Sequence, residues 1–515
     1  METQPQRYDS FYLSSRLHLT AAFVSLLAGA AIAVGLCARE DYRGAVVITA
    51  MSLCAAFVFS DAVTIETALL TWFATTPIAS FYLRFPLDRS IITYDRLVFF
   101  LFLLLMLTGT RSIFFDRSFS DGRAKSQEAV FSLTKFEVAW SLLSVVALAS
   151  GFMQSNNLVY AVRIAVDAFW LPLVAFYFAR RYFSLRNSGR MLVLGCIALA
   201  ILLFATGSFE LATGVDLFQY NGAELVREGE RRVNGPFLSD SSFAIICLLL
   251  FLILQAAPRL ISLRFDRSGK LIYFVATVCA GLGALLSAFR VVAMAIFICW
   301  IGQIWLEHRV TGKLFWKSDR VRRRLSLAIA IGMILALFGG WFALRAAPAL
   351  GARLIDPRSA FGRLATWRAA SEIAFENPVF GVGLGNYADY YDQYYYYSGE
   401  DPEEVFETKA VNSPHSNLLW IASELGLSGL ALYIAANVFL FLIGWRAFKE
   451  AADRQQAVAS SCYIALVLAY WLSGLTLASG YYSDLNLYLL FLLGALSSRF
   501  PKRIHRAQSS PSFLL

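Results

Sequence analysis

Charged side chains are scarce in this chain. Among its 515 residues, Asp, Glu, Lys and Arg make up only 16%, whereas hydrophobic residues make up 58% and aromatic residues 15%. A soluble domain of this size cannot bury so much apolar surface, and the apolar residues recur in runs close to the length of a membrane-spanning helix. The composition therefore excludes an ordinary soluble protein and predicts an all-α, polytopic membrane helix bundle.

Cysteine and histidine are also few. The seven cysteines fall in or beside apolar runs and form no CxxC pair, so the sequence indicates neither a disulfide framework nor a zinc cluster. The four histidines are His18, His308, His415 and His505. The chain has no convincing internal repeat and no linker rich in Gly, Ser or Pro. We expect no metal ion and no cofactor.

The apolar runs predict about 12–14 transmembrane helices. The candidate spans lie near 17–37, 44–60, 67–84, 94–110, 134–152, 158–178, 191–208, 241–261, 271–289, 291–306, 325–346, 428–445, 457–475 and 485–498. The expected parts of the chain are N-terminal transmembrane helices (1–207), central transmembrane helices with a first outward loop (208–346), a large outward helical loop (347–427), and C-terminal transmembrane helices with a tail (428–515).

Basic residues cluster in every second loop, so the clusters share one side of the membrane, which the positive-inside rule makes cytoplasmic. The clusters fall within 111–125, 180–190, 264–270, 309–324, 446–454 and 499–506. Both termini then lie inside. The net charge of +9 is largely this topology signal, so we expect no nucleic-acid partner, and attraction to anionic membrane lipid is a secondary interpretation.

Two long segments, 208–240 and 347–427, then face outward. Both carry arginines that run against the orientation rule, and such charges need a local reason. An anionic ligand is one reason, which we favour for a minority of them, and ion pairs with neighbouring glutamates are the other. Helical spacing of Leu364, Trp367, Ala370 and Ile373 predicts an amphipathic helix in the second segment.

The stretch 412–429, N-S-P-H-S-N-L-L-W-I-A-S-E-L-G-L-S-G, is the most informative. Ser413 can cap a helix, Pro414 suits its first position, and Gly426 can end or kink it. His415 would then lie in the first turn, where the helix dipole favours anions and a neutral imidazole able to accept a proton. The alternative is a capped interfacial helix whose histidine only faces water.

Two further sites carry arginine near a membrane boundary. Arg290 lies between two apolar runs with almost no loop, so we place it at the outer ends of two spans, facing the bundle or its mouth. Snorkelling to the interface is the alternative. Arg232, in R-R-V-N-G-P-F, precedes the next span and could bind a phosphate through a bidentate contact. The alternative is that it belongs to a charged loop tip.

Other patterns have simpler explanations. The run 381–386 resembles a phosphate loop but lacks the strand–turn–helix context, so we predict a tight turn. The tyrosines of 387–397 favour an aromatic belt over sugar stacking, and the acids near them favour solvation over an acid/base or metal role. Arg163 and Asp167, one helical turn apart, predict a buried pair, with an ion path as the alternative.

These residues resemble the O-antigen ligase and polymerase superfamily of bacterial polysaccharide assembly. Its ligases carry His-[Asn/Ser/Gln]-x9-Gly-x2-Gly, and His415-Ser416 followed by Gly426 and Gly429 has that spacing. The pattern Arg363-x3-Trp367, with N-P and G-V-G after it, is similar to the family's conserved region. The resemblance also matches Arg232 and Arg290 to two family arginines. Met294 departs from the pattern, because Leu is usual there, and this weakens assignment to the ligases in particular.

The resemblance implies a GT-C-like bundle in the bacterial inner membrane with a periplasmic active site. It implies a metal-independent, inverting glycosyltransferase that uses an undecaprenyl-diphosphate-linked glycan as donor. Arg290 and Arg232 would hold the diphosphate, His415 would take the acceptor proton as the catalytic base, and Arg363 would help bind substrate.

The two enzyme interpretations differ in the acceptor, and two further interpretations are not enzymes. An O-antigen ligase transfers to the lipid A core, and the histidine motif favours it. A polymerase transfers to a second lipid-linked glycan, and the many spans, long outer segment and Met294 favour it. A flippase would need broken helices and charges within the spans, and a scaffold leaves the outer arginines unexplained. Contact with other polysaccharide-assembly proteins is a further expectation.

Overall fold

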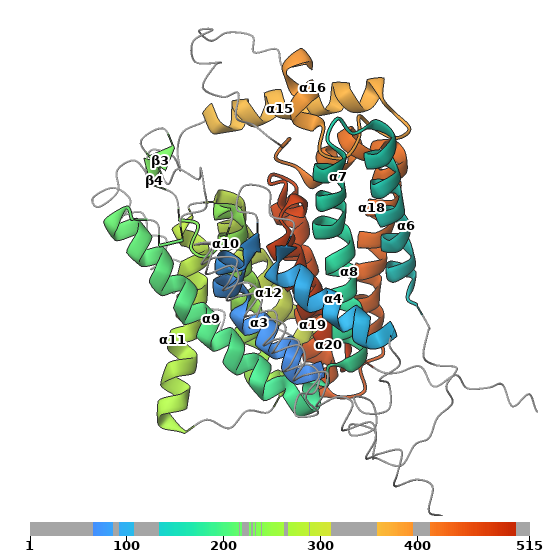
Figure 1. Cartoon of the computed structure of the whole chain (residues 1–515). Helices are drawn as coiled ribbons and strands as arrows, with labels where there is room; N and C mark the ends of the chain where they lie inside the picture. The colour runs from blue at the N-terminus through green and yellow to red at the C-terminus, as the bar shows by residue number, and fades with distance from the viewer. Residues whose placement is uncertain are drawn as a thin grey trace, which may run out of the picture.

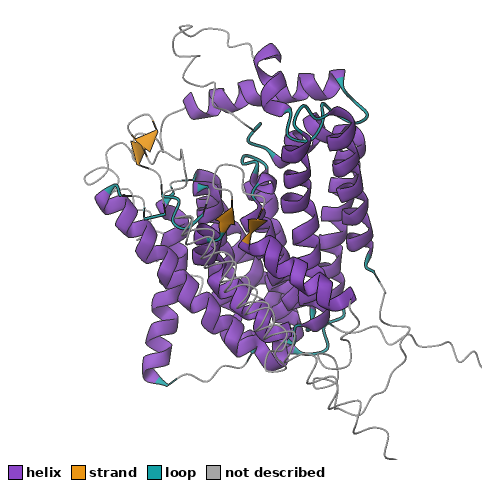
Figure 2. Cartoon of the chain, in the orientation of Figure 1, coloured by secondary structure: helices purple, strands orange, loops and turns teal. Residues whose placement is uncertain are grey.

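The structure is a computed structural model of the chain. It describes residues 65–85, 92–107, 133–215, 217–218, 226–227, 230–231, 233–237, 239–261, 266–287, 289–310, 358–394 and 413–500. Helices dominate this part of the chain (Figure 2), and its strands are two small antiparallel hairpins. One pairs β1 (Arg84–Phe85) with β2 (Ile92–Thr93), and the other pairs β3 (Val226–Arg227) with β4 (Glu230–Arg231). The predicted all-α, polytopic membrane helix bundle is confirmed.

Eight helices of the described chain are long and apolar enough to cross a membrane. They are α6 (Lys135–Gln154), the continuous α7, η2 and α8 (Leu158–Ile164, Ala165–Trp170 and Leu171–Tyr182), α9 (Leu185–Thr213), α10 (Asp240–Leu260), α11 (Arg267–Leu286), α12 (Arg290–Val310), α18 (Asn417–Lys449) and α19 (Arg454–Gly474). Each coincides with a predicted span, because a backbone in lipid must satisfy its hydrogen bonds within its own helix.

The other predicted spans divide into two groups. Three coincide with shorter or less apolar helices, namely α3 (Ile65–Tyr82), α4 (Tyr94–Leu107) and α20 (Ser483–Ser497). The candidates 17–37, 44–60 and 325–346 lie outside the described residues. The total of 12–14 spans and the four-part division of the chain therefore stay predictions.

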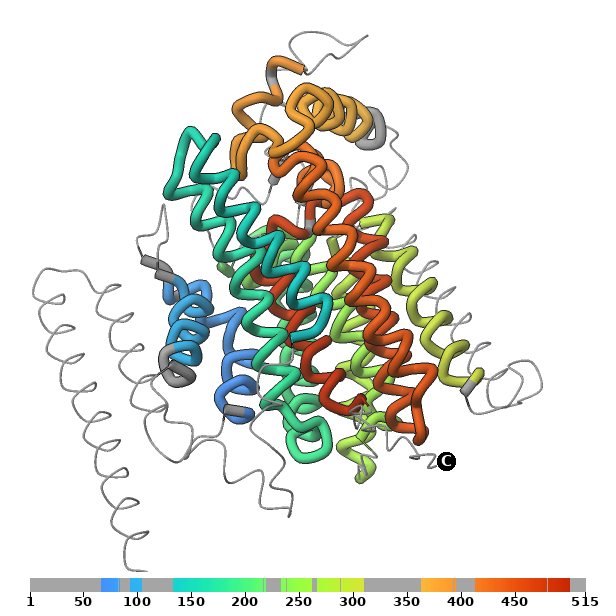
Figure 3. Tube along the Cα trace, turned by 90° about the vertical axis from the view of Figure 1, so that its right-hand side faces the viewer, coloured from blue at the N-terminus to red at the C-terminus, as the bar shows by residue number. Residues whose placement is uncertain are grey.

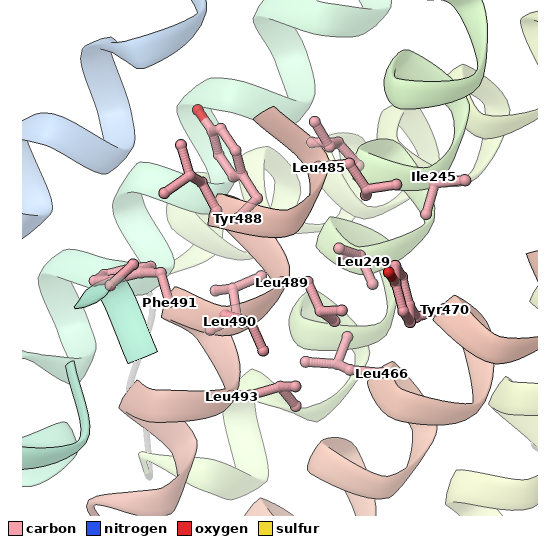
Figure 4. Packing of buried hydrophobic residues seen from close by; sticks show 14 of the residues in the cluster. Ile245, Leu249, Leu466, Tyr470, Leu485, Tyr488, Leu489, Leu490, Phe491 and Leu493 are labelled. Atoms are coloured by element: carbon pink, nitrogen blue, oxygen red, sulfur yellow. The ribbon is translucent and has the colours of Figure 1, made fainter. Parts of the chain in front are cut away.

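The core of the bundle surrounds α20. Its side chains lie between α10 and α19, where Leu489 and Leu493 meet Leu249 and Leu466 (Figure 4). On another side α20 packs closely on α8, because a Cβ added at Gly494 would lie 2.6 Å from a backbone oxygen of α8. Small residues that let helix backbones approach are typical of packing in membranes.

The two ends of the bundle differ. Helices α15 (Arg358–Glu376) and α16 (Tyr387–Tyr394) lie across one end, on the same side as β3 and β4 (Figure 1, Figure 3). We call this the α15 end. Basic residues gather in the α8–α9 and α18–α19 connections at the opposite end, which we call the basic end. The two long segments predicted to face one side of the membrane therefore do share an end of the bundle.

The predicted pairing of Arg163 with Asp167 is wrong. Asp167 instead binds Arg96 of α4, with Nη2 2.6 Å from Oδ2 and Nε 2.8 Å from Oδ1. The reason is local, because Asp167 lies in the π-helical insertion η2, whose wider turn shifts it away from the residue four positions earlier. The Arg163 guanidinium lies over the Tyr160 ring, 5.5 Å from its centroid.

Candidate functional site

His415 lies just before α18, at the α15 end. The helix begins at Asn417, and Ser416 is its N-cap with extended backbone angles (φ −153°, ψ 129°). His415 has φ 48°, a left-handed conformation that the first turn of a helix does not contain. The predicted cap at Ser413 and the predicted place of His415 within the first turn are therefore wrong. The imidazole is half-buried and still adjoins a helix N-terminus, whose field favours anions.

The helix that follows His415 is firmly held at its start. The side-chain oxygen of Asn417 accepts the backbone N–H of Gly480 at 2.7 Å. Trp420, one turn later, stacks on Phe169 at 5.8 Å and meets Tyr481 edge-on at 5.3 Å. Because these contacts involve η2 and η5 (Ser479–Tyr481), the segment behind His415 is fixed by two other parts of the bundle.

Tyr481 adds a polar contact beside this helix. Its hydroxyl is hydrogen-bonded to that of Tyr160. Burial raises the pKa of Tyr481 well above its ordinary value, so its phenol stays protonated at neutral pH. It can therefore act there as a hydrogen-bonding group and not as a base.

Glu424 connects α18 to the outer segment. Its carboxylate is buried, and Oε2 accepts the N–H of Gly385 at 2.9 Å and the indole N–H of Trp420 at 2.8 Å. The other oxygen, Oε1, accepts the N–H of Tyr387 at 3.2 Å, at the start of α16. A buried carboxylate needs such donors, and a helix N-terminus supplies them. Our sequence reasoning missed Glu424, although one acidic residue in the apolar run L-L-W-I-A-S-E-L-G was the signal.

Two glycines allow the outer segment to meet α18 backbone to backbone. A Cβ at Gly381 would lie 2.4 Å from the carbonyl carbon of Glu424, and a Cβ at Gly426 would lie 2.5 Å from that of Val379. Both residues also have φ near +66°. Only glycine combines so close a backbone approach with a positive φ without strain.

The backbone hydrogen bonds explain why the helix breaks at Gly426. Gly426 has φ 66° and ψ −167°, which interrupts the helix as predicted. Across this break Val382 donates to Ser423 O at 2.9 Å and Leu427 donates to Pro378 O at 2.7 Å. The turn after α15 thus satisfies groups that the break exposes. The tight turn predicted for 381–386 is confirmed, with positive φ at Gly381, Gly383 and Gly385.

Arg290 is the first residue of α12, at the α15 end, as predicted. It is exposed, so its side chain does not point into the interior of the bundle, and both the mouth and snorkelling to the interface agree with that position. Met294, one turn later, is also exposed and takes no part in the core. The guanidinium is thus placed where it can meet a ligand that approaches this end.

Arg232 lies outside the described residues, but hydrogen bonds fix the position of the segment that follows it. The carbonyl of Val233 accepts the hydroxyl of Ser287 at 3.2 Å, in the turn between α11 and α12. Gly235 donates its N–H to buried Glu210 of α9 at 2.9 Å. These bonds join the segment that follows Arg232 to the turn that precedes Arg290.

Arg363 lies on α15, which also belongs to the α15 end, and is half-buried. The helix buries Ala370 and Ile373 against residues of the turn and of α16, so an amphipathic helix is confirmed. Leu364 was expected on the buried face and is 54% exposed, which corrects that part of the prediction. The reason is that the partner surface formed by 382–391 covers only the later turns of α15.

The remaining polar candidates divide between described and undescribed residues. Asp389 is exposed, which agrees with the prediction of a solvated acid. It also accepts a hydrogen bond from the side chain of Asn156 at 3.1 Å. Glu403, Glu404 and Tyr395–Tyr397 lie outside the described residues. Within the part of the chain that the structure describes, no three residues among His, Cys, Asp and Glu lie close enough together to hold a metal ion.

Comparison with known families bears on the region that carries this site. Residues 272–434 match the family model described as O-antigen ligase. This match supports the O-antigen ligase and polymerase superfamily for the part of the chain that it covers. The matched region begins in α11 and ends in α18, so it contains Arg290, Arg363, His415 and Glu424. No curated protein matches the chain.

The family match and the apolar helices together support a multi-pass membrane protein with an enzyme activity of the ligase and polymerase type. Such enzymes act on lipid-linked glycans. The structure places all three residues at one end of the bundle: Arg290 begins α12, Arg363 lies on α15, and His415 lies just before α18.

Proposed function

We propose that this protein is an O-antigen ligase, which transfers a glycan from an undecaprenyl-diphosphate donor to the lipid A core at the periplasmic face of the bacterial inner membrane. The observation that carries the proposal is the placement of His415 and Arg290. Both lie at helix N-termini of one end of the bundle, within the ligase-family domain.

The orientation rests on charge. Basic residues such as Arg180, Arg181, Arg446 and Lys449 lie at the basic end, which the positive-inside rule places in the cytoplasm. The α15 end then faces the periplasm, where both the lipid-linked donor and the lipid A core are presented. Membrane lipids surround the bundle.

In the proposed reaction the acceptor hydroxyl oxygen attacks the anomeric carbon from the face opposite the diphosphate. The bond between that carbon and the diphosphate oxygen breaks, so the configuration inverts and undecaprenyl diphosphate leaves. His415 takes the hydroxyl proton, which requires a neutral imidazole. No metal ion is required, because Arg290 and Arg232 stabilise the charge that develops on the leaving diphosphate. Arg363 contributes to substrate binding.

The test uses matched variants in a complemented null strain. His415→Ala and Arg290→Ala should abolish polysaccharide transfer at normal membrane levels. His308→Ala and Arg309→Ala serve as controls, because both residues lie in the last turn of α12 at the opposite end of the helix that Arg290 begins. If both site variants still build full-length polysaccharide, the proposed site is wrong.

A gel of the lipopolysaccharide that the null strain makes distinguishes the two possible acceptors. Loss of all capped lipopolysaccharide supports a ligase. Caps of a single repeat unit, or loss of an exopolysaccharide, would instead show a polymerase that joins lipid-linked units. The folded outer segment of α15 and α16 is compatible with either acceptor, so the choice of a ligase over a polymerase rests on the histidine motif.

A further inference from the structure

The α6 and α18 pair presents a lipid-facing surface. Along α6, Val138, Leu142 and Val145 are exposed at helical spacing. Along α18, Ile434 and Val438 are exposed in the same way. These two spanning helices pack side by side. Large apolar side chains that repeat on one outward face of a membrane span are the side chains that meet acyl chains.

This apolar surface continues to the α15 end of both helices. On α6 it ends with Phe152 and Met153, of which Met153 is 71% exposed. On α18 it ends with Leu427, 59% exposed, directly after the break at Gly426. From Leu427 to Lys449 the helix has about 23 residues, or roughly 34 Å. That length is close to the hydrocarbon thickness of about 30 Å, so Leu427 belongs at the membrane boundary.

The turn after α15 is attached at this same level. Pro378 accepts the N–H of Leu427 at 2.7 Å, and Val379 O accepts the hydroxyl of Ser428 at 2.7 Å. On the α6 side, Phe380 O accepts the hydroxyl of Ser150 at 3.3 Å. The backbone of 378–380 is therefore tied to the ends of two spans, which sets its height relative to the membrane.

Exposed apolar side chains occur at the end of α15 and in this turn. Phe375 of α15 is 83% exposed, and Val379 and Phe380 of the turn are 58% and 42% exposed. The backbone bonds above hold Val379 and Phe380 at the level of Leu427 and the end of α6. We call the combined surface the outer rim, which consists of Phe152, Met153, Phe375, Val379, Phe380 and Leu427. Several exposed apolar side chains at one level of the bundle indicate a contact surface.

We propose that the outer rim inserts into the bilayer leaflet on the α15 side, with lipid acyl chains and the headgroup boundary as its occupant. The continuity of the rim with the lipid-facing surfaces of α6 and α18 favours lipid over a protein partner. Insertion removes the rim from water, and this transfer is favourable by about 25 cal/mol for each Å² of apolar surface buried. The turn then fixes α15 to the membrane surface independently of the reaction that the site performs.

Membrane attachment at the rim also sets the height of the candidate site. The turn that follows Phe380 contains Gly381 and Gly385, which contact Glu424. Glu424 in turn belongs to the short helix behind His415. A rim fixed in the leaflet therefore holds His415 at a constant distance from lipid-anchored molecules in that leaflet.

Spin labels test this inference directly. Phe375→Cys and Val379→Cys are made in a cysteine-free chain, labelled with a nitroxide, and reconstituted in lipid nanodiscs. Collision rates are measured with oxygen, which concentrates in lipid, and with a nickel chelate, which stays in water. Val145→Cys serves as the control within a span, and Asp389→Cys as the exposed control in water. We expect both rim labels to favour oxygen and to fall between the two controls.

Two results would overturn the proposal. Nickel accessibility equal to that at position 389 would show that the rim lies in water. Protection from both reagents would show that protein covers it, either a second copy or another partner. If the cysteine-free chain does not fold, a photo-crosslinking phenylalanine analogue is placed at position 375 or 389 of the natural chain, and cross-linking to lipid is compared. Cross-linking to lipid at 375 but not at 389 is expected, and equal cross-linking contradicts the insertion.

Discussion

Glu424 accepts the backbone N–H of Gly385 at 2.9 Å, which joins the helix behind His415 to the glycine turn of the outer segment. The two residues are 39 positions apart in the chain. The contact is partly buried, and the N–H of Gly385 is one of three donors to the same carboxylate. The helix behind His415 and the outer segment are therefore joined through this carboxylate.

Glu424→Ala should destabilise this end of the bundle strongly. The substitution leaves three N–H groups, two buried and one partly buried, without their acceptor, at about 1–3 kcal/mol each. Glu424→Gln keeps one acceptor oxygen and should cost less. The matched control is Glu372→Ala, which removes an exposed ion pair with Arg368 and should cost at most about 1 kcal/mol. Thermal unfolding in nanodiscs and protease cleavage between α16 and α18 measure the difference. A Glu424→Ala protein as stable as the control would contradict the link.

Gly381→Ala should damage the fold although the change is one methyl group. The added Cβ would lie 2.4 Å from backbone atoms of Glu424, and φ is already +67°. Backbone atoms cannot move aside as a flexible side chain can, so we expect a loss of about 2 kcal/mol or more. Gly302→Ala is the control, because nothing lies within 4 Å of its Cβ. It should stabilise α12 by about 0.5–1 kcal/mol. Unfolding by SDS titration compares both variants, and equal effects would refute the close contact.

Asn417→Ala should reduce transfer by misplacing His415, two residues earlier. The variant leaves the N–H of Gly480 without its acceptor, at a cost of about 1–3 kcal/mol, and 1.4 kcal/mol corresponds to about tenfold in rate. Asn437→Ala is the control on the same helix, since it loses a comparable bond to Trp471 away from the site. Transfer per folded molecule should fall about tenfold only for Asn417→Ala. An equal decrease in both variants would indicate a general loss of stability.

Arg96 and Asp167 should behave as a coupled pair. Because this pair is partly buried, Arg96→Ala or Asp167→Ala leaves the other charge without its partner and should cost about 1–3 kcal/mol. The double variant should cost less than the sum of the two, by about 0.5–3 kcal/mol. Arg163→Ala combined with Asp167→Ala should be additive, because Arg163 contacts Tyr160. A double-mutant cycle by SDS unfolding measures both couplings, and coupling to Arg163 would restore the original prediction.

Several features of the fold followed directly from the sequence. Apolar runs of spanning length predicted eight of the described helices, because a buried backbone in lipid has few alternatives to a helix. The motif from His415 to Gly429 identified both the family and the helix break at Gly426. Local spacing was less informative at Ser413, since Ser416, three residues later, takes the N-cap position although its side chain makes no capping hydrogen bond.

The sequence alone thus determined the membrane class, most helix positions, the family and the arginines and histidine of the candidate site, because these depend on composition and on short motifs. Only the tertiary structure decided that Glu424 connects α18 to the outer segment, that Asp167 pairs with Arg96, and that Ser287 joins the loop after Arg232 to the turn before Arg290. Each of these contacts depends on residues from different helices, and their mutual placement follows from packing of the whole bundle. Local periodicity contains no information about such contacts, since it describes one helix at a time.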